Sequence, residues 1–80
     1  MHLLADYTPS DFAAWKRDFD AEAEDRMNAG LTLLQMWRDA DAGTKALCLF
    51  EVNDRGRAEA WLHKESALGA PVTARFLRTA

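Results

Sequence analysis

The hydrophobic and polar positions along the chain change their period from one segment to the next, and each change predicts an element. A short apolar run at residues 2–7 suits a first strand. Thr8 and Pro9 then open a helix, because threonine caps helices and proline suits the first helical position. The apolar stripe of this helix repeats at spacings of three and four and consists of Phe12, Trp15, Phe19, Ala23 and Met27. Gly30 ends the helix at the left-handed position that glycine favours.

The second half of the chain predicts a hairpin, a helix and a last strand. Residues 31–52 suit two strands, and the turn-forming residues 39–43 lie between them. Asn53 or Asp54 caps the second helix. Its apolar face consists of Ala58, Trp61, Leu62 and Glu65, with Leu68 nearby. Residues 69–71, Gly-Ala-Pro, end this helix, and the alternating residues 72–78 suit the last strand.

The order strand, helix, strand, strand, helix, strand predicts an α+β protein with the ferredoxin-like βαββαβ fold. We expect one domain, residues 1–80, in which a four-stranded antiparallel sheet carries both helices on one face. A loop at 39–43 pairs Arg38 with Thr44 and Leu34 with Cys48. One face of the hairpin then carries Thr32, Leu34, Met36, Ala46, Cys48, Phe50 and Val52, and the other carries Leu31, Leu33, Gln35, Trp37, Lys45, Leu47, Leu49 and Glu51. A slip of one residue would exchange these faces.

Both faces of this hairpin are apolar, although two helices cover only one. The more uniformly apolar face suits the helices, whose own stripes are apolar. The other face keeps leucines in its centre and polar residues around them, as protein interfaces do. A large exposed apolar patch marks a partner, and a second copy is the commonest one. We therefore expect a homodimer, with the two sheets packed face to face through Leu31, Leu33, Trp37, Leu47 and Leu49.

Composition and charge exclude several other partners. The formal net charge is −3, and the basic residues of the first helix alternate with acids, so a nucleic-acid surface is not expected. No apolar stretch approaches the length of a membrane helix, and the apolar start is too short for a signal peptide. The single cysteine, Cys48, excludes an internal disulfide and suits a buried apolar position. We expect a cytoplasmic protein without a membrane partner.

One set of residues resembles a known family. The set is Asp11-Phe12-x-x-Trp15-Lys16-x-x-Phe19-Asp20, then Arg26, Gly30 and Phe50-Glu51-Val52-x-Asp54. It is similar to small bacterial proteins of the dimeric α+β barrel superfamily, which includes antibiotic-biosynthesis-monooxygenase-like and stress-responsive barrel domains. The resemblance covers nearly the whole chain and says more about fold than about function. It implies a ferredoxin-like subunit, a dimer whose sheets form a barrel, and a small-molecule pocket between helices and sheet.

Candidate site residues follow from this expected pocket. Its lining is assigned to Trp15, Phe19, Arg26, Phe50 and Trp61. An aromatic stripe at helical spacing is also what a core needs, so these residues have a structural reading as well. We expect either a barrel that binds a small, largely apolar organic molecule, or a cofactor-independent enzyme of the monooxygenase or isomerase type.

Candidates for catalysis are weak, and the residues suggest neither a metal nor a cofactor. His63 is a candidate general base, because histidine as a residue type suits proton transfer near neutral pH, but helical spacing places it roughly opposite the apolar face of its helix. Glu51 lies in a strand, where it either forms an ion pair with Arg26, Lys45 or Arg75, or is a site carboxylate with a shifted pKa. His2 is too distant in sequence from His63 to suggest a metal site.

Overall fold

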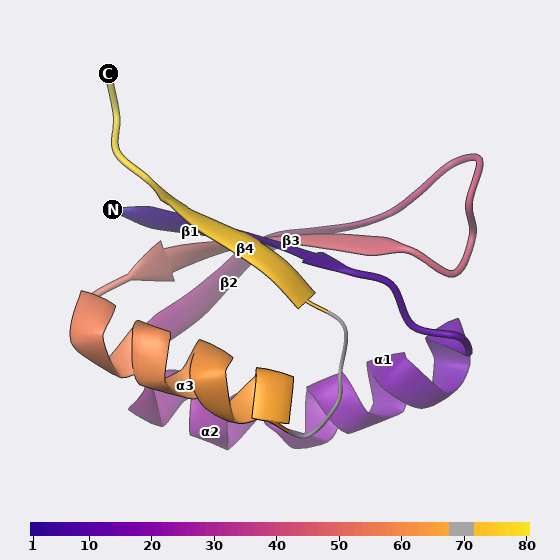
Figure 1. Cartoon of the computed structure of the whole chain (residues 1–80), viewed down its shortest axis with the longest axis horizontal. Coiled ribbons are helices and arrows are strands. Elements are labelled where there is room, and N and C mark those ends of the chain that lie inside the picture. Colours follow the sequence, from indigo (N-terminus) through magenta and orange to yellow (C-terminus); the bar gives the residue numbers. More distant parts are fainter. Residues whose placement is uncertain (68–71) are drawn as a thin grey trace.

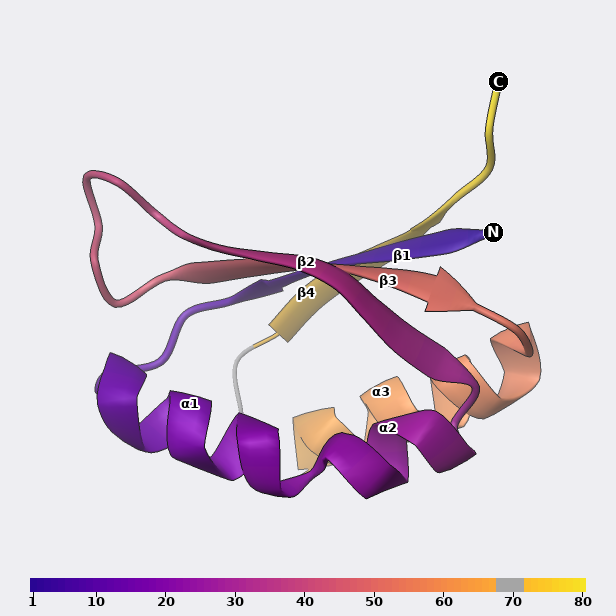
Figure 2. The same ribbon diagram turned by 180° about the vertical axis from the view of Figure 1, so that it is seen from behind.

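The computed structural model of the chain describes residues 1–67 and 72–80. The elements run β1 (His2–Tyr7), α1 (Phe12–Ala21), α2 (Ala23–Asn28), β2 (Leu31–Arg38), β3 (Ala46–Val52), α3 (Arg55–Ala67) and β4 (Val72–Leu77). The four strands form one antiparallel sheet in the order β2-β3-β1-β4. Figures 1 and 2 show all helices on one side of this sheet. The predicted ferredoxin-like α+β fold is therefore confirmed.

The first predicted helix is broken into α1 and α2. Asp11, rather than Thr8, caps α1, because its carboxylate accepts a hydrogen bond from the Ala14 N–H at 3.1 Å. Glu22 interrupts the helix, and its N–H returns to the Phe19 carbonyl at 3.2 Å. The break rotates the apolar stripe out of register. Met27, predicted to be buried, is 69% exposed, and Arg26 is only 6% exposed.

The β2–β3 register corrects the predicted faces of the hairpin. Arg38 pairs with Ala46 and Met36 with Cys48, two residues beyond the predicted partners, which leaves their faces unchanged. A bulge between Leu33 and Gln35 then adds one residue to β2 and reverses the alternation before it. Leu31 and Leu33, predicted on the open face, consequently lie opposite Val52 and Phe50 on the helix side. The residue pairs on the helix side are Leu31–Val52, Leu33–Phe50, Met36–Cys48 and Arg38–Ala46.

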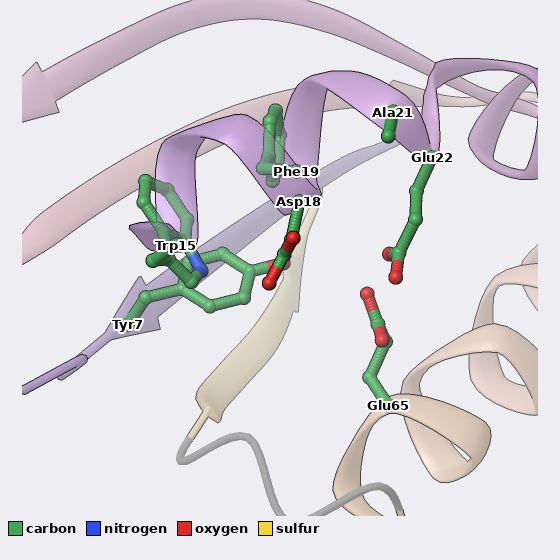
Figure 3. Close-up of a pocket in the computed structure, with 7 residues that line it drawn as sticks. All are labelled: Tyr7, Trp15, Asp18, Phe19, Ala21, Glu22 and Glu65. Atoms are coloured by element: carbon green, nitrogen blue, oxygen red, sulfur yellow. The ribbon is translucent and has the colours of Figure 1, made fainter. Parts of the chain in front are cut away.

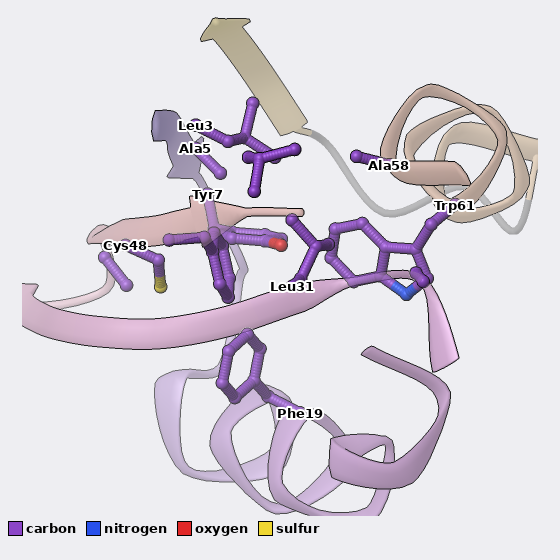
Figure 4. Close-up of a cluster of buried hydrophobic side chains, with 12 residues drawn as sticks. Leu3, Ala5, Tyr7, Phe19, Leu31, Cys48, Ala58 and Trp61 are labelled. Carbon is purple, nitrogen blue, oxygen red and sulfur yellow. The ribbon is translucent and has the colours of Figure 1, made fainter. Parts of the chain in front are cut away.

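The core lies between the sheet and the helices (Figure 4). Alternate residues of β1 and β3 point into it, and α1 and α3 cover them. Its buried apolar members are Leu3, Ala5, Tyr7, Phe19, Ala29, Leu31, Ala46, Cys48, Phe50, Val52, Ala58 and Trp61. Burial raises the pKa of the Cys48 thiol to about 12, so this cysteine stays protonated and unreactive. Its predicted role as a small buried hydrophobe is confirmed.

No helix of the described residues lies on the other face of the sheet. Leu4 of β1 and Leu47 and Leu49 of β3 lie on it, and all three keep part of their surface exposed. Trp37, opposite Leu47 on the edge strand β2, is 46% exposed. Within the described part of the chain, no helix has the length and apolarity needed to cross a membrane. Leu68 and the predicted helix end at 69–71 lie outside the described residues.

Candidate functional site

A pocket of about 370 Å³ opens between the sheet and the helices. It is lined by Tyr7, Trp15, Asp18, Phe19, Ala21, Glu22 and Glu65. Figure 3 shows the three elements that supply them: Tyr7 comes from β1, Glu65 from α3, and the others from α1 and its end. The volume falls in the lower part of the range found for small-molecule sites, about 300–1,000 Å³.

Aromatic rings form the apolar wall of this pocket. The Trp15 ring lies 4.9 Å from the Tyr7 ring and 5.1 Å from the Phe19 ring, measured between centroids. The helical spacing of four places Trp15 and Phe19 on one face of α1, and Tyr7 is the last inward-pointing residue of β1. Phe12 stacks behind Trp15 at 5.6 Å. The rings pack against one another at tilted angles and form one apolar wall.

Among the described residues that line the pocket, Tyr7 carries a buried hydroxyl without a hydrogen-bond partner. Tyr7 is only 2% exposed, and its hydroxyl has no hydrogen-bond partner among the described residues. Its ring extends from β1 into the group of lining residues (Figure 3). Burial, followed by the nearby Cys48 and Glu65, raises the tyrosine pKa well above its ordinary value. The phenol therefore stays neutral and keeps a proton to donate. Buried hydroxyls without a partner are rare and ask for an explanation.

Two carboxyl groups face each other across the pocket, Glu22 from the α1–α2 junction and Glu65 from α3 (Figure 3). Glu65 is only 9% exposed. Burial raises the Glu65 pKa to about 7, and hydrogen bonding to Glu22 and repulsion from its charge act in the same direction. Arg26 and Lys64 oppose this shift. The Glu65 carboxyl therefore keeps its proton up to about pH 7.

Arg26 packs against the pocket residue Phe19 and does not itself line the pocket. At the break between α1 and α2, its guanidinium donates a hydrogen bond to the Phe19 carbonyl. The guanidinium carbon also lies 3.6 Å from the centre of the Phe19 ring. Burial lowers the Arg26 pKa from its usual range, and the group still carries its charge at neutral pH. Arg26 thus holds the helix break and the Phe19 ring in place, and is absent from the pocket lining.

The predicted pocket residues divide into two groups. Trp15 and Phe19 line the pocket. Phe50 is fully buried and Trp61 is 6% exposed, and both pack in the core, 6.1 Å apart between ring centroids. Their predicted place in the lining is corrected, because they fill the space next to the pocket instead of facing it.

The two catalytic candidates do not reach the pocket. His63 is exposed on α3 and lines a separate surface hollow with Leu62 and Val72. Glu51 is exposed on the open face of the sheet, opposite His2 and Thr32 of the neighbouring strands. Arg26 lies on the helix side, so the proposed pairing of Glu51 with Arg26 is wrong. Among the described residues no ion pair includes Glu51.

The polar residues of the pocket were not predicted from the sequence. Tyr7 alternates along β1 with the same period as Leu3 and Ala5, so strand alternation alone places its side chain on the inward face. Glu65 stands among the apolar residues of its helix face, and an acid at such a position was the available signal. No comparable signal exists for Glu22, because it reaches the pocket only through the break in the helix.

Comparison with known proteins adds no relative. No family model matches this chain, and no curated protein matches it. In the part of the chain that the structure describes, no group of three or more histidine, cysteine, aspartate or glutamate side chains is arranged to hold a metal ion. The functional interpretation therefore depends on the geometry of the pocket and of the open sheet face.

Proposed function

We propose that this protein binds a small organic molecule in the pocket between α1, α3 and the sheet. The observation that carries this is the Tyr7 hydroxyl, buried and without a partner among the described residues in a pocket of about 370 Å³. A bound polar group would supply the missing hydrogen bond, and the aromatic wall would hold the apolar part of the molecule. An apolar cavity with a few placed polar groups is the usual form of a ligand site.

A fragment screen observed by amide NMR tests this binding. Fragments should shift resonances near Tyr7, Phe19 and Glu65. Ala21→Trp, at the pocket mouth, should block these shifts, and Ala13→Trp is the matched control because Ala13 is exposed on α1 and absent from the lining. Equal binding to both variants, or shifts confined to the open face, would count against the pocket.

The partner of the open face is also part of this proposal. We propose that two copies pack their sheets face to face, as in the dimeric α+β barrels that the sequence resembles. Support comes from the apolar open face, where Leu47 and Leu49 lie beside Trp37, and from the placement of all the helices on the other side. A protonated, buried Cys48 is consistent with the cytoplasmic location that we propose.

Sedimentation equilibrium tests the dimer. The native chain should have twice the monomer mass at micromolar concentration. Trp37→Glu should give monomers, because it places a charge within the proposed interface. Met27→Glu is the matched control, since Met27 is an exposed apolar residue on the helix side. A monomeric native protein would remove the dimer from the proposal.

An enzyme of the isomerase type is the second candidate, and the Glu22–Glu65 pair favours it. A carboxyl with a pKa of about 7 suits general acid–base catalysis at neutral pH. The acidic lining, however, would oppose the negative charge that develops when a proton leaves carbon. Deuterium incorporation into aryl ketones in D2O tests this chemistry. Incorporation that Glu65→Gln abolishes would support an enzyme, and equal rates in both proteins would contradict it.

A further inference from the structure

The lining of the pocket has a charge as well as a shape. Asp18, Glu22 and Glu65 contribute carboxyl groups, and none of the described residues that line the pocket is basic. Arg26, a buried cation, donates to the Phe19 carbonyl, lies over the Phe19 ring and is absent from the lining. Lys16 is directed to Asp20 on the outer surface of α1 at 2.7 Å. The charge facing the cavity is therefore negative once the carboxyls ionise.

The aromatic wall attracts positive charge too. Trp15, Tyr7 and Phe19 present ring faces and edges around the same volume as the carboxyls. Cations bind over aromatic faces, and tryptophan and tyrosine bind them best. A pocket that combines carboxylates with aromatic rings is complementary to an organic cation. A bare metal ion fits less well, since no metal-ligating group of three or more side chains converges in the described residues.

We propose that the pocket binds a protonated amine that carries a flat apolar group, with the ammonium between Glu22 and Glu65 and the apolar group against Trp15. This inference rests on the proposed function, since it names the chemical class of the molecule bound in the same pocket. The unpartnered Tyr7 hydroxyl, 2% exposed, is the independent sign that this acidic cluster faces a ligand.

The proton between the two glutamates gives the binding a pH dependence. Groups facing Glu65 are Glu22 and Arg26 from α1 and α2, Tyr7 from β1, and Lys64 on its own helix. An ammonium favours the ionised form of Glu65, so its binding releases the proton that this carboxyl holds near pH 7. Affinity for an amine should rise as the pH increases from 6 to 8, while affinity for a neutral molecule should stay constant.

Three probes that share a phenyl ring on a two-carbon chain and differ in charge test the inference by calorimetry and amide NMR. They are 2-phenylethylamine, 2-phenylethanol and 3-phenylpropanoate. We expect the amine to bind at least about tenfold more tightly than the alcohol, and the carboxylate to bind most weakly, because charge-assisted hydrogen bonds are about twice as strong as neutral ones. Amine binding should release protons, seen as a dependence of the heat on the buffer.

Two isosteric variants assign the effect to the carboxyl pair. Glu22→Gln and Glu65→Gln should each weaken amine binding about tenfold and weaken alcohol binding much less, because the alcohol loses no charge-assisted bond from a cation. Glu24→Gln removes the same charge from an exposed site on α2 outside the lining, so it should leave both probes unchanged. Because the charge series is read on the native protein, a variant that fails to fold does not remove the test.

The outcomes separate this inference from the proposed function. Alcohol or carboxylate binding as tight as that of the amine, in a manner that Ala21→Trp blocks, would overturn the amine and keep the pocket. An amine effect equal in Glu22→Gln and Glu24→Gln would overturn it as well, since it would be general attraction to an acidic protein. If neither these probes nor the fragments bind at the pocket, the proposed function fails and the amine with it.

Discussion

The two faces of the sheet have similar residues and opposite surroundings. Along β3, the inward residues Ala46, Cys48 and Phe50 are at most 1% exposed, whereas Leu47 and Leu49 between them keep part of their surface exposed. Both sets are apolar. The difference comes from the helices, which all lie on one side (Figure 2). The open apolar face, which no described helix covers, is therefore the basis of the dimer that we propose.

The covered face is itself divided. At one end Phe50 and Trp61 fill the space between sheet and helices. At the other end, where α1 breaks, the filling is incomplete and polar groups enter, namely the Tyr7 hydroxyl and the Glu65 carboxyl. Packing without voids gives stability, and a polar void reduces it. We read the first end as the stabilising part of the fold and the second as the part available for binding.

The largest contrast between the faces should come from truncating one residue on each. Phe50→Ala should lower the free energy of unfolding by about 3–5 kcal/mol, because it leaves a cavity in the core. Leu49→Ala should cost less, and its effect should depend on protein concentration if the open face joins two copies. Urea unfolding at two concentrations measures both. Equal, concentration-independent losses would mean that the open face has no partner.

Arg26 packs against Phe19 on the covered face, and its removal should show how much this contact stabilises the fold. Arg26→Ala should cost about 2–3 kcal/mol, because the Phe19 carbonyl loses a hydrogen bond from a charged donor and the Phe19 ring loses its cover. Arg57→Ala is the control, since Arg57 is exposed and should change stability by less than about 0.5 kcal/mol. Urea unfolding measures both variants. Similar small effects would show that Arg26 does not hold the helix break.

Glu65 should make stability depend on pH, unlike the apolar end of the same face. Its folded pKa of about 7 lies above the unfolded value of 4.5, so the folded protein binds more protons between these pH values. The free energy of unfolding should therefore fall as the pH rises from 4.5 to 7. After a discount for solvent screening, we expect a fall of about 1–2 kcal/mol.

Urea unfolding of Glu65→Gln at the same pH values identifies the group responsible. The variant has no carboxyl to titrate, so most of this pH dependence should disappear. Glu24→Gln should keep the slope of the native protein, because Glu24 is exposed and outside the pocket. A native protein whose stability rises over this pH range would mean that Glu65 ionises normally and that the carboxyl pair is separated.

Local patterns predicted the element order well, because strand alternation, helical periodicity and the end signals at Gly30 and Asp54 act within a few residues. The bulge after Leu33 carries no such signal. It moved Leu31 from the predicted open face to the core, where it is 4% exposed. One added residue reverses a strand's faces, so register errors become errors about the interface.

The site was harder to predict than the fold for a related reason. Trp15 and Phe19 follow the helical period, and both line the pocket. Glu22 reaches the pocket because the helix stops there, and this break is stabilised by Arg26 from the next helix. Contacts between elements of this kind appear only when the chain is folded. Phe50 and Trp61 were misplaced for the opposite reason, since aromatic residues at the right spacing fill a core as readily as they line a pocket.

The smallest expected effect bears most directly on the polar end of the covered face. Tyr7→Phe removes a buried hydroxyl that has no partner among the described residues. An unsatisfied buried donor loses its hydrogen bonds to water and gains none in the folded protein. The variant should therefore be as stable as the native protein or up to about 1 kcal/mol more stable. Thermal and urea unfolding without ligand measure this. Tyr7→Leu, which also removes ring contacts with Trp15, should be clearly less stable.

Tyr7→Phe should also bind the probes less tightly than the native protein does. The stability and the affinity of this variant together show whether the hydroxyl belongs to a binding site. A hydroxyl that lowers the stability of the free protein and raises its affinity for a ligand belongs to a binding site. Removal of a purely structural hydroxyl would lower both stability and affinity, or would change neither. Tyr7→Phe should weaken the tightest pocket fragment several-fold while stability holds or rises. If the variant instead loses 1–2 kcal/mol of stability, the hydroxyl already has a partner in the free protein, and the polar end of the face is structural like the apolar end.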